Sequence, residues 1–294
     1  MTDKAPEKPV DNLASAEHLA GKLPGLLLEA ERVAHTFMKG LHGRRRVGQG
    51  ESFWQFRQYQ PGDQRRDIDW RQSAKRDDAF IRQMEWEASQ TAWLWRDASE
   101  SMNYRGFKNL PLKKDYAEVL LMALCIMILN GGEQVSLLGT DLAPQTNYNS
   151  IQRIYEYLKV QKTLRQQGRP VGARSEVVLI SDFFWPMEEL HGFCGGLAKR
   201  GIQGSLVQVN CPSEKTLPFK GRMKFYDIEN GKAPPLDIQQ VEAVREEYER
   251  KFLEHQEKLA AAAKSWGWHF NSVYTNERPE DALFKLYENL AVKK

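Results

Sequence analysis

The chain has 294 residues, of which 41% are hydrophobic and 28% are charged, and its formal net charge is +3 at pH 7. This balance is typical of a globular protein with a sizeable core, and it is too mildly basic to indicate a nucleic-acid-binding protein. No run approaches the roughly 18 apolar residues that a membrane-spanning helix needs, so we expect no membrane span.

The cysteines and the N-terminus both favour the cytoplasm. The three cysteines, Cys125, Cys194 and Cys211, are odd in number and lack CxxC spacing. This predicts buried, reduced thiols, not a disulfide framework or a zinc site. The first residues contain no apolar core like that of a signal peptide. We therefore expect a cytoplasmic protein.

The N-terminal third divides into three parts. Residues 1–20 are polar and contain prolines, which predicts a disordered tail. Apolar residues recur at helical spacing over 23–41, and a segment rich in glycine, arginine and aspartate follows at 43–78. A strand is expected at 80–86. We interpret 21–90 as a helix and an Arg/Asp-rich module packed on the main domain.

From residue 91 to 294, apolar strands alternate with helices, which predicts βαβ units and an α/β fold with a mostly parallel sheet. The expected strands are 91–96, 135–138, 177–180, 205–209 and 270–274, and the expected helices are 113–130, 151–166, 187–200, 238–264 and 279–292. Residues 212–236 interrupt the alternation. The turn signal Asn230-Gly231 within them predicts a hairpin or excursion near the edge of the sheet.

Oxygen-bearing side chains follow two of these strands. Asp97, Ser99 and Ser101 form an Asp-x-Ser-x-Ser sequence after strand 91–96, and Asp182 follows strand 177–180. Parallel strands deliver their carboxyl ends to one edge of a sheet, where ligand sites form. Such hard oxygen donors suit Mg²⁺ or Mn²⁺. The alternative is structural, because Ser and Asp after a strand also close turns and cap helices without a metal.

This pattern resembles the metal-ion-dependent adhesion site of von Willebrand factor A domains. There, an Asp-x-Ser-x-Ser loop, a threonine loop and a later aspartate surround one divalent cation, and a partner's acidic side chain often supplies the last ligand. The resemblance implies a metal site of Asp97, Ser99, Ser101, Thr146 and Asp182, with Thr140 as the fallback for the threonine. Phe183-Phe184 departs from the pattern, since a glycine is usual after the last aspartate.

A second fingerprint lies in the Arg/Asp-rich segment. It comprises Gly48-x-Gly50-x-x-Phe53, Arg57-x-Tyr59, Pro61-Gly62-Asp63, Arg66-x-Ile68-Asp69-Trp70, Ser73-Ala74-Lys75 and Glu85-x-Glu87. Together with the Asp-x-Ser-x-Ser sequence, it resembles the domain of unknown function 58 family. The resemblance implies a von Willebrand A-like fold with an extra N-terminal module and, as a partner, a MoxR-type AAA+ ATPase or its client protein. Arg96 departs from the family pattern, because this cation directly precedes Asp97.

The Arg/Asp-rich segment itself is interpreted as a salt-bridged module that is structural or binds a partner. Residues 63–78 contain five basic and five acidic side chains, a balance that favours internal pairing over binding of a polyanion. The residues singled out are Arg57, Asp63, Arg65, Arg66, Asp69 and Trp70. The alternative is phosphate or nucleic-acid binding by Arg44-Arg45-Arg46 beside Gly48 and Gly50, but the segment contains no P-loop sequence.

Nothing in the chain marks a catalytic nucleophile or base. No Gly-x-Ser-x-Gly surrounds Ser99 or Ser101, and the six histidines show no HExxH spacing. We therefore expect a non-enzymatic adaptor that uses its metal site to bind a partner during protein assembly or maturation. One alternative is a metal-dependent phosphohydrolase or nuclease using Asp97 and Asp182. Another is a scaffold with a vestigial metal site, which docks through the Arg/Asp-rich module.

Overall fold

The computed structural model describes residues 25–42, 53–58, 68, 70–73, 79–84, 91–160, 168–173, 175–226 and 234–291. The chain divides into two compact units. Residues 1–38 and 90–294 form the larger unit, and residues 39–89 form the smaller one.

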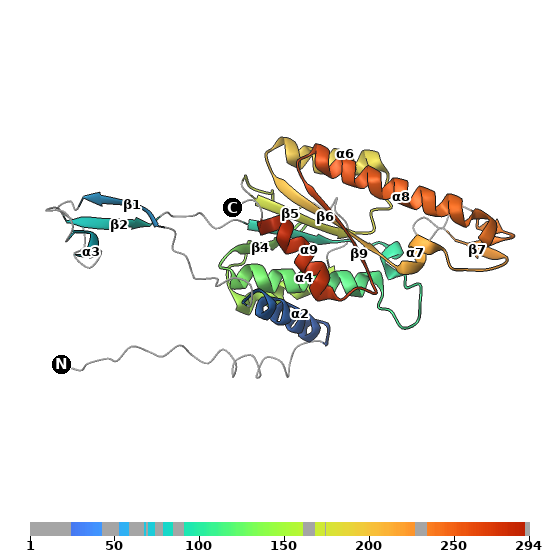
Figure 1. Ribbon diagram of the computed structural model, residues 1–294, viewed down its shortest axis with the longest axis horizontal. Helices are drawn as coiled ribbons and strands as arrows, with labels where there is room; N and C mark the ends of the chain where they lie inside the picture. Colours follow the sequence, from blue (N-terminus) through green and yellow to red (C-terminus); the bar gives the residue numbers. More distant parts are fainter. Residues whose placement is uncertain are drawn as a thin grey trace. The chain divides into compact units, whose positions relative to one another are not determined.

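The larger unit is built on a five-stranded parallel sheet (Figure 1). Its strands are β3 (Thr91–Arg96), β4 (Gln134–Leu137), β5 (Ser175–Ser181), β6 (Gln203–Asn210) and β9 (His269–Tyr274). They lie in the order β4-β3-β5-β6-β9, and every neighbouring pair is parallel. The predicted α/β fold with a mostly parallel sheet is confirmed. The carboxyl ends of the strands meet at one edge, which we call the carboxyl edge.

One face of the sheet is covered by α6 (Met187–Lys199) and α8 (Val241–Ser265). Side chains from both helices enter a single apolar core with those of β3, β5 and β6. The strand residues of this core are Trp93, Trp95, Val177, Leu179 and Leu206, and the helix residues are Leu190, Cys194, Leu197, Leu259 and Ala263. Alternate residues of β3 face this core because successive side chains of a strand point to opposite faces.

The other face is covered by α4 (Lys113–Asn130), α5 (Ile151–Val160) and α9 (Pro279–Ala291). After a charged first turn, helix α4 is mostly apolar around its circumference and most of its residues are buried, as expected of a helix enclosed by other elements. Helix α2 (Gly25–His42) belongs to the same unit as far as Met38. The ring of its Phe37 packs on those of Phe284 and Tyr287 in α9. This helix thus packs on the main domain, with which it shares a compact unit as far as Met38.

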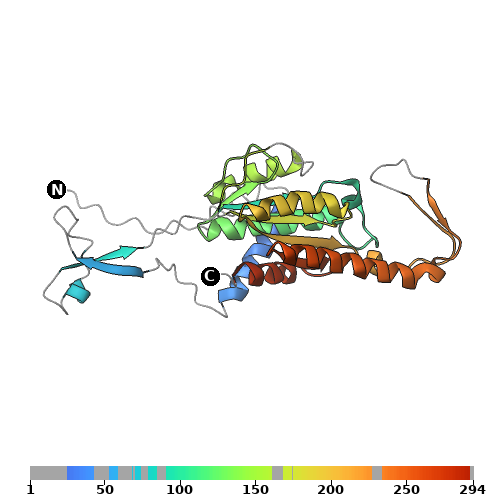
Figure 2. The same ribbon diagram turned by 90° about the horizontal axis from the view of Figure 1, so that it is seen from above.

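The predicted excursion is a hairpin. After α7 (Pro212–Thr216), β7 (Met223–Phe225) pairs with β8 (Leu236–Ile238) in antiparallel register. Figure 2 shows α8 running from this hairpin back along the sheet. Arg222 and Asp237 form an exposed ion pair across the hairpin.

In the smaller unit, β1 (Phe53–Gln58) pairs with β2 (Phe80–Met84) in antiparallel register, with the short helix α3 (Trp70–Ser73) between them in sequence. The Ser73 hydroxyl accepts a hydrogen bond from the backbone N–H of Phe80 at 2.9 Å, which fixes the end of α3 to the start of β2. Strand β2 was predicted from the sequence, whereas β1 was not.

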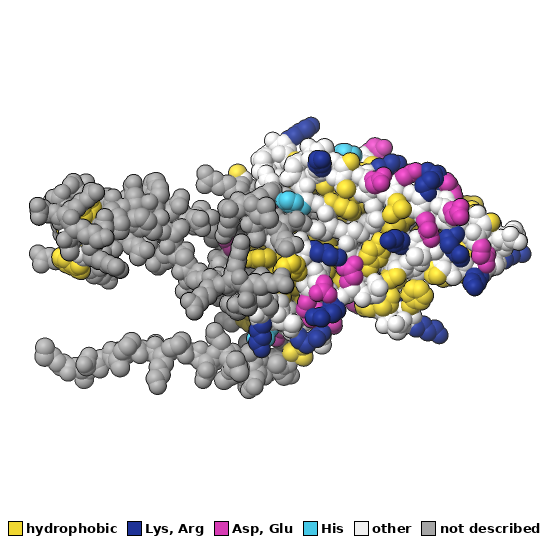
Figure 3. All heavy atoms as spheres, in the orientation of Figure 1, with side chains coloured by type: hydrophobic (Ala, Val, Ile, Leu, Met, Phe, Trp, Pro, Cys, Tyr) yellow, Lys and Arg dark blue, Asp and Glu magenta, His cyan; other side chains and the backbone are white. Residues whose placement is uncertain are grey.

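The exposed face of α8 carries ion pairs between neighbouring turns. Arg250 contacts both Glu247 and Glu254, and Lys251 contacts Glu247. Figure 3 shows such basic and acidic side chains interspersed over this part of the surface. Within the part of the chain that the structure describes, no helix is long and apolar enough to cross a membrane.

Candidate functional site at the carboxyl edge of the sheet

Asp97 directly follows β3 and is almost completely buried. Its backbone N–H donates to the carbonyl of Ile180 in β5, so the two strands still hold each other at this point. One carboxylate oxygen accepts the backbone N–H of Ser99 at 2.9 Å. The other accepts the hydroxyl of Ser181 at 2.5 Å and the indole N–H of Trp185 at 3.1 Å. Asp97 therefore ties the β3 turn to the end of β5.

Ser99 and Ser101 lie at the surface end of the same turn. Their hydroxyl oxygens are 3.1 Å apart, and both side chains are half-buried. Adjacent ligands of an octahedral Mg²⁺ lie about 3 Å apart when each is about 2.1 Å from the ion. The spacing of the two hydroxyls is thus compatible with a shared ion, but their hydrogen bond to each other explains it equally well.

Asp182 follows β5 and is fully buried. One of its carboxylate oxygens lies 2.8 Å from the ammonium nitrogen of Lys113, the first residue of α4. The same ammonium lies 2.5 Å from a carboxylate oxygen of Glu214 in α7. The exposed fractions of these side chains are 1% for Lys113, 1% for Asp182 and 13% for Glu214. Lys113 thus bridges two acids that come from different loops of the edge.

Two opposing effects act on the pKa of Lys113. Burial alone would lower it, but attraction to Asp182 and Glu214, with the hydrogen bonds to both, outweighs burial and raises the pKa above its usual value. The Lys113 side chain is therefore a charged ammonium at neutral pH. The pKa of Glu214 is raised because its burial outweighs the attraction of Lys113.

The turn after Asp182 is held in an unusual backbone conformation. Phe183 has a φ of 56°, in the left-handed region that favours glycine. This is the position where the adhesion-site pattern usually has glycine. The ring of Phe183 is buried in the core and packs edge-on against Trp185, and its carbonyl lies 3.0 Å from a ring nitrogen of His255. Burial of a large aromatic side chain offsets the cost of the backbone conformation.

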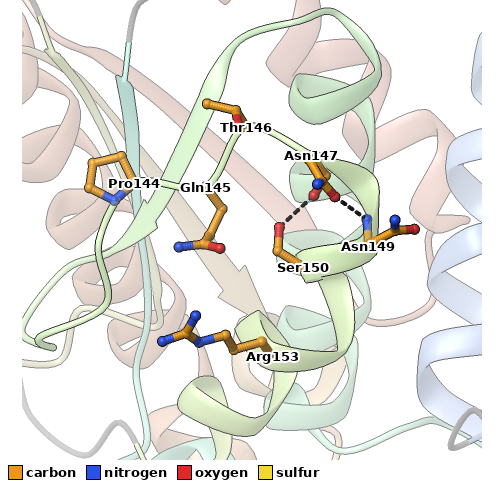
Figure 4. Close-up of a pocket in the computed structure, with 7 residues that line it drawn as sticks. All are labelled: Pro144, Gln145, Thr146, Asn147, Asn149, Ser150 and Arg153. Atoms are coloured by element: carbon orange, nitrogen blue, oxygen red, sulfur yellow. Dashed lines mark hydrogen bonds between the residues drawn. The ribbon is translucent and has the colours of Figure 1, made fainter.

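The structure does not bring Thr146 to this edge. The residue before it, Gln145, forms an antiparallel bridge with Val135, which pairs with Ala92 near the start of β3. Asp97 lies five residues after Ala92, just beyond the end of β3. At about 3.3 Å per residue, this places it about 17 Å from Ala92 along the strand direction. Thr146 instead lines a pocket of about 340 Å³ with Asn147 and others (Figure 4). This corrects the expectation that Thr146 lies beside Asp97.

The hydroxyl of the fallback threonine, Thr140, forms its hydrogen bonds within the turn that contains it. Its hydroxyl donates to the carbonyl of Leu137 at 2.8 Å and accepts the backbone N–H of Leu142 at 3.3 Å. The side chain is buried and closes the turn after β4.

Arg96 contacts Asp97 only through the backbone, since its guanidinium donates to the Asp97 carbonyl at 3.3 Å. Its guanidinium is buried and lies 2.8 Å from a carboxylate oxygen of Glu118 in α4, and it also donates to the carbonyl of Leu158 in α5. Burial lowers the pKa of Arg96, which the charge of Glu118 opposes. Arg96 therefore pairs with the helices on the α4 face, whereas the Asp97 carboxylate contacts the turn that begins α6.

The residues predicted in the Arg/Asp-rich module lie almost entirely outside the described part of the chain. Arg57 is in β1, although its side chain is not described, and Trp70 begins α3 with an exposed side chain. Asp63, Arg65, Arg66 and Asp69 lie outside the described residues. The pairing predicted for this module stays a prediction.

Taken together, the donors do not fit the adhesion-type metal site predicted from the sequence. Neither Thr146 nor Thr140 joins Asp97, Ser99 and Ser101, and the carboxylate of Asp182 is already bound by an ammonium. Among the described residues, no group of three or more His, Cys, Asp or Glu side chains could hold a metal ion. The arrangement favours a rigid, internally paired edge over an open coordination site.

Comparison with known proteins identifies the family. The model of a protein family described as "Protein of unknown function DUF58" matches residues 55–258. The chain belongs to the DUF58 family. Uncharacterized proteins of Mycobacterium bovis and Mycobacterium tuberculosis are each 24% identical to it over 276 residues, which cover 88% of this chain and 85% of theirs.

Similar solved structures have low sequence identity to this DUF58 protein. BatB from Bacteroides thetaiotaomicron covers 70% of this chain and all of its own, at 15% identity and a TM-score of 0.41. An aerotolerance-related membrane protein from Bacteroides fragilis covers 69% of this chain and all of its own, at 16% identity and a TM-score of 0.43. The SpRpn10 VWA domain covers 67% of this chain and 95% of its own, at 13% identity and a TM-score of 0.33.

Four residues of the site were missed by sequence reasoning: Lys113, Ser181, Trp185 and Glu214. Ser181 carried a signal, because it precedes Asp182 at a strand end that was already marked. Lys113 also carried one, because it is the first residue of the long apolar helix that follows the Asp97 turn. Nothing local to Glu214 connects it with Asp182, because the pairing depends on how α7 returns to the edge.

Proposed function

We propose that this DUF58 protein is a non-enzymatic adaptor of the cytoplasm that docks a partner at the carboxyl edge of its sheet. The partner proposed is a MoxR-type AAA+ ATPase or its client protein, as the family resemblance suggested, and the process is protein assembly or maturation. The observation that supports docking is a pair of exposed aromatic rings, Phe107 and Phe184, on the two loops that border the Asp97 turn.

The two loops meet over Lys113. The ring centroids of Tyr104 and Phe184 lie 5.8 and 5.4 Å from its ammonium nitrogen. Phe184 is 47% exposed and stacks on His255 with ring centroids 5.6 Å apart. Exposed aromatic side chains on a rigid base are common anchors of protein interfaces.

The loop after the Asp97 turn is itself fastened to the edge. The Tyr104 hydroxyl lies 3.0 Å from that of Ser213, and the backbone N–H of Gly106 donates to the sulfur of Cys211. Phe107 is 42% exposed, and Arg105 and Lys108 on either side of it are exposed cations. This composition favours a partner segment that carries an acidic side chain next to an apolar one.

The chemistry of the edge supports binding better than catalysis. A hydrolase using Asp97 and Asp182 would need their carboxylates to bind a metal or to accept a proton from water. In this structure, each of the four carboxylate oxygens of Asp97 and Asp182 already accepts a hydrogen bond from a group of the protein, and one of them also forms an ion pair with Lys113. A ring nitrogen of the half-buried His255 lies 3.0 Å from the carbonyl of Phe183, so that nitrogen is also engaged within the protein.

A binding measurement with single substitutions tests this proposal. Calorimetric titration of the full chain with the MoxR-type ATPase of the same organism is compared for wild type, Phe107→Ser and Phe184→Ser. Truncating an interface anchor commonly weakens binding by about tenfold or more, and we expect at least this loss for each variant. Leu28→Ser on α2, which removes another exposed apolar side chain, is the control and is expected to bind like wild type.

Two outcomes would contradict the proposal. Unchanged affinity of both phenylalanine variants would move docking away from this edge. Turnover of a generic phosphodiester that is lost in Asp182→Asn would favour the hydrolase instead.

A further inference from the structure

We infer that the ammonium of Lys113 is the resident cation of the carboxyl edge, in the place where an adhesion-type site holds a divalent ion. The site of this protein would therefore work without a metal. The inference depends on the contacts of Lys113 alone and holds whether or not the aromatic loops dock a partner.

The first argument is the position of the ammonium. Lys113 begins α4, so its side chain starts at the carboxyl edge and reaches inward to Asp182, the aspartate expected to serve the metal. The ammonium donates to Asp182 at 2.8 Å and to Glu214 at 2.5 Å. A cation that bridges carboxylates from two separate loops does the structural work of a divalent ion.

The second argument is enclosure. Lys113 has no exposed surface, and the rings of Tyr104 and Phe184 both lie within 6 Å of its ammonium. A buried charge is retained only when it is paired, and these rings add the attraction of their faces for a cation. The ammonium is therefore held in place and is not free to swing aside for an incoming ion.

The third argument is repulsion. A divalent ion bound by Asp182 would lie within a few ångströms of the Lys113 ammonium, where like charges repel strongly in a poorly solvated site. Asp97 cannot supply a replacement, because its oxygens hold Ser99, Ser181 and Trp185 together. Removing the ammonium should therefore open the edge to a metal, since Asp182 and Glu214 would lose their partner.

Calorimetric titration of Mn²⁺ into the metal-stripped full chain tests the inference. For wild type we expect no saturable binding tighter than about 1 mM, the weak end of protein sites for divalent ions, and the same melting temperature in EDTA as in Mn²⁺. Lys113→Ala is expected to bind Mn²⁺ and to melt at a higher temperature when Mn²⁺ is present. Lys114→Ala, which removes the neighbouring lysine, is the control and should behave like wild type.

Wild-type binding of one Mn²⁺ per chain that is lost in Asp97→Ala would overturn the inference. A folded Lys113→Ala that binds no Mn²⁺ would also overturn it, because the ammonium would then not be what excludes the ion. If Lys113→Ala does not fold without metal, refolding of this variant in Mn²⁺ but not in EDTA would support the inference. Failure of the variant to refold in either solution would contradict it. The wild-type titration remains decisive in either case.

Discussion

Replacing Lys113 by methionine should destabilise the protein more than most single substitutions. Methionine keeps the length and apolar stem of the side chain but removes the ammonium that lies 2.8 Å from Asp182 and 2.5 Å from Glu214. Removing one partner of a buried ion pair costs about 3–5 kcal/mol, because the remaining charge stays buried without compensation. Total stability of a domain is about 5–15 kcal/mol, so the loss would be a large part of it.

The effect of Lys113→Met should depend on pH in a defined direction. The pKa of Glu214 is raised above its usual value even in wild type, and without the ammonium it should rise further. An acid with a raised folded pKa favours folding when protonated and costs stability as pH rises through that pKa. The destabilisation should therefore be largest at pH 7 and shrink as pH falls toward the usual pKa of a carboxyl group.

The wild-type protein should lose stability at high pH. Because the folded pKa of Lys113 is raised above its usual value of 10.5, its contribution is complete below that pH and is lost as pH rises through the folded value. Lys113→Met should lack this alkaline loss.

Urea unfolding followed by tryptophan fluorescence measures these differences. The matched control is Arg250→Met on α8, which removes an exposed cation that also contacts two glutamates and should change stability little. A difference between Lys113→Met and wild type below about 1 kcal/mol at pH 7, the usual size for an exposed pair, would refute the reasoning. So would a difference that grows as pH falls.

Four further predictions concern packing and reactivity. Asp97→Ala should lower the unfolding free energy by about 3 kcal/mol, because the buried hydroxyl of Ser181 and the half-buried indole N–H of Trp185 lose their acceptor; Asp97→Asn should cost less in the same urea assay. Gly204→Ala should cost about 2 kcal/mol by overpacking, since an added Cβ would lie 2.6 Å from the Trp268 ring. Gly192→Ala, in open space on α6, should instead add about 0.5–1 kcal/mol. Burial raises the pKa of Cys194 to about 12, so Ellman's reagent at pH 8 should label it only after unfolding, and labelling of native protein would contradict its burial.

Most of the larger unit could be predicted because its elements differ sharply in pattern. Helix α4 was predicted at 113–130 and found at Lys113–Asn130, since a polar loop precedes it and a Gly-Gly pair ends it. Strand β5 was predicted at 177–180, its apolar centre. The observed strand, Ser175–Ser181, begins two residues earlier and ends one residue later. The predicted hairpin or excursion contains the antiparallel pair β7 and β8, whereas its turn signal Asn230-Gly231 lies outside the described residues.

The site was predictable only as far as strand ends determine it. Asp97 and Asp182 reach the same edge of the sheet because they follow parallel neighbours, β3 and β5. Thr146 could not be placed, because its position depends on the register with which a loop returns to Val135. Lys113 could not be assigned to Asp182, because sequence shows the start of a helix but not the direction of its first side chain.

The return of the chain that carries Thr146 away from the site has a consequence of its own. Strand β4 is the last strand on its side of the sheet, and an open edge of this kind is a template for pairing with another molecule. Val135 and Gln145 exchange both of their backbone hydrogen bonds, so the loop occupies part of that edge. The bridge that places Thr146 away from Asp97 thus also covers part of an open sheet edge, and proline at position 145 would remove one of its two hydrogen bonds.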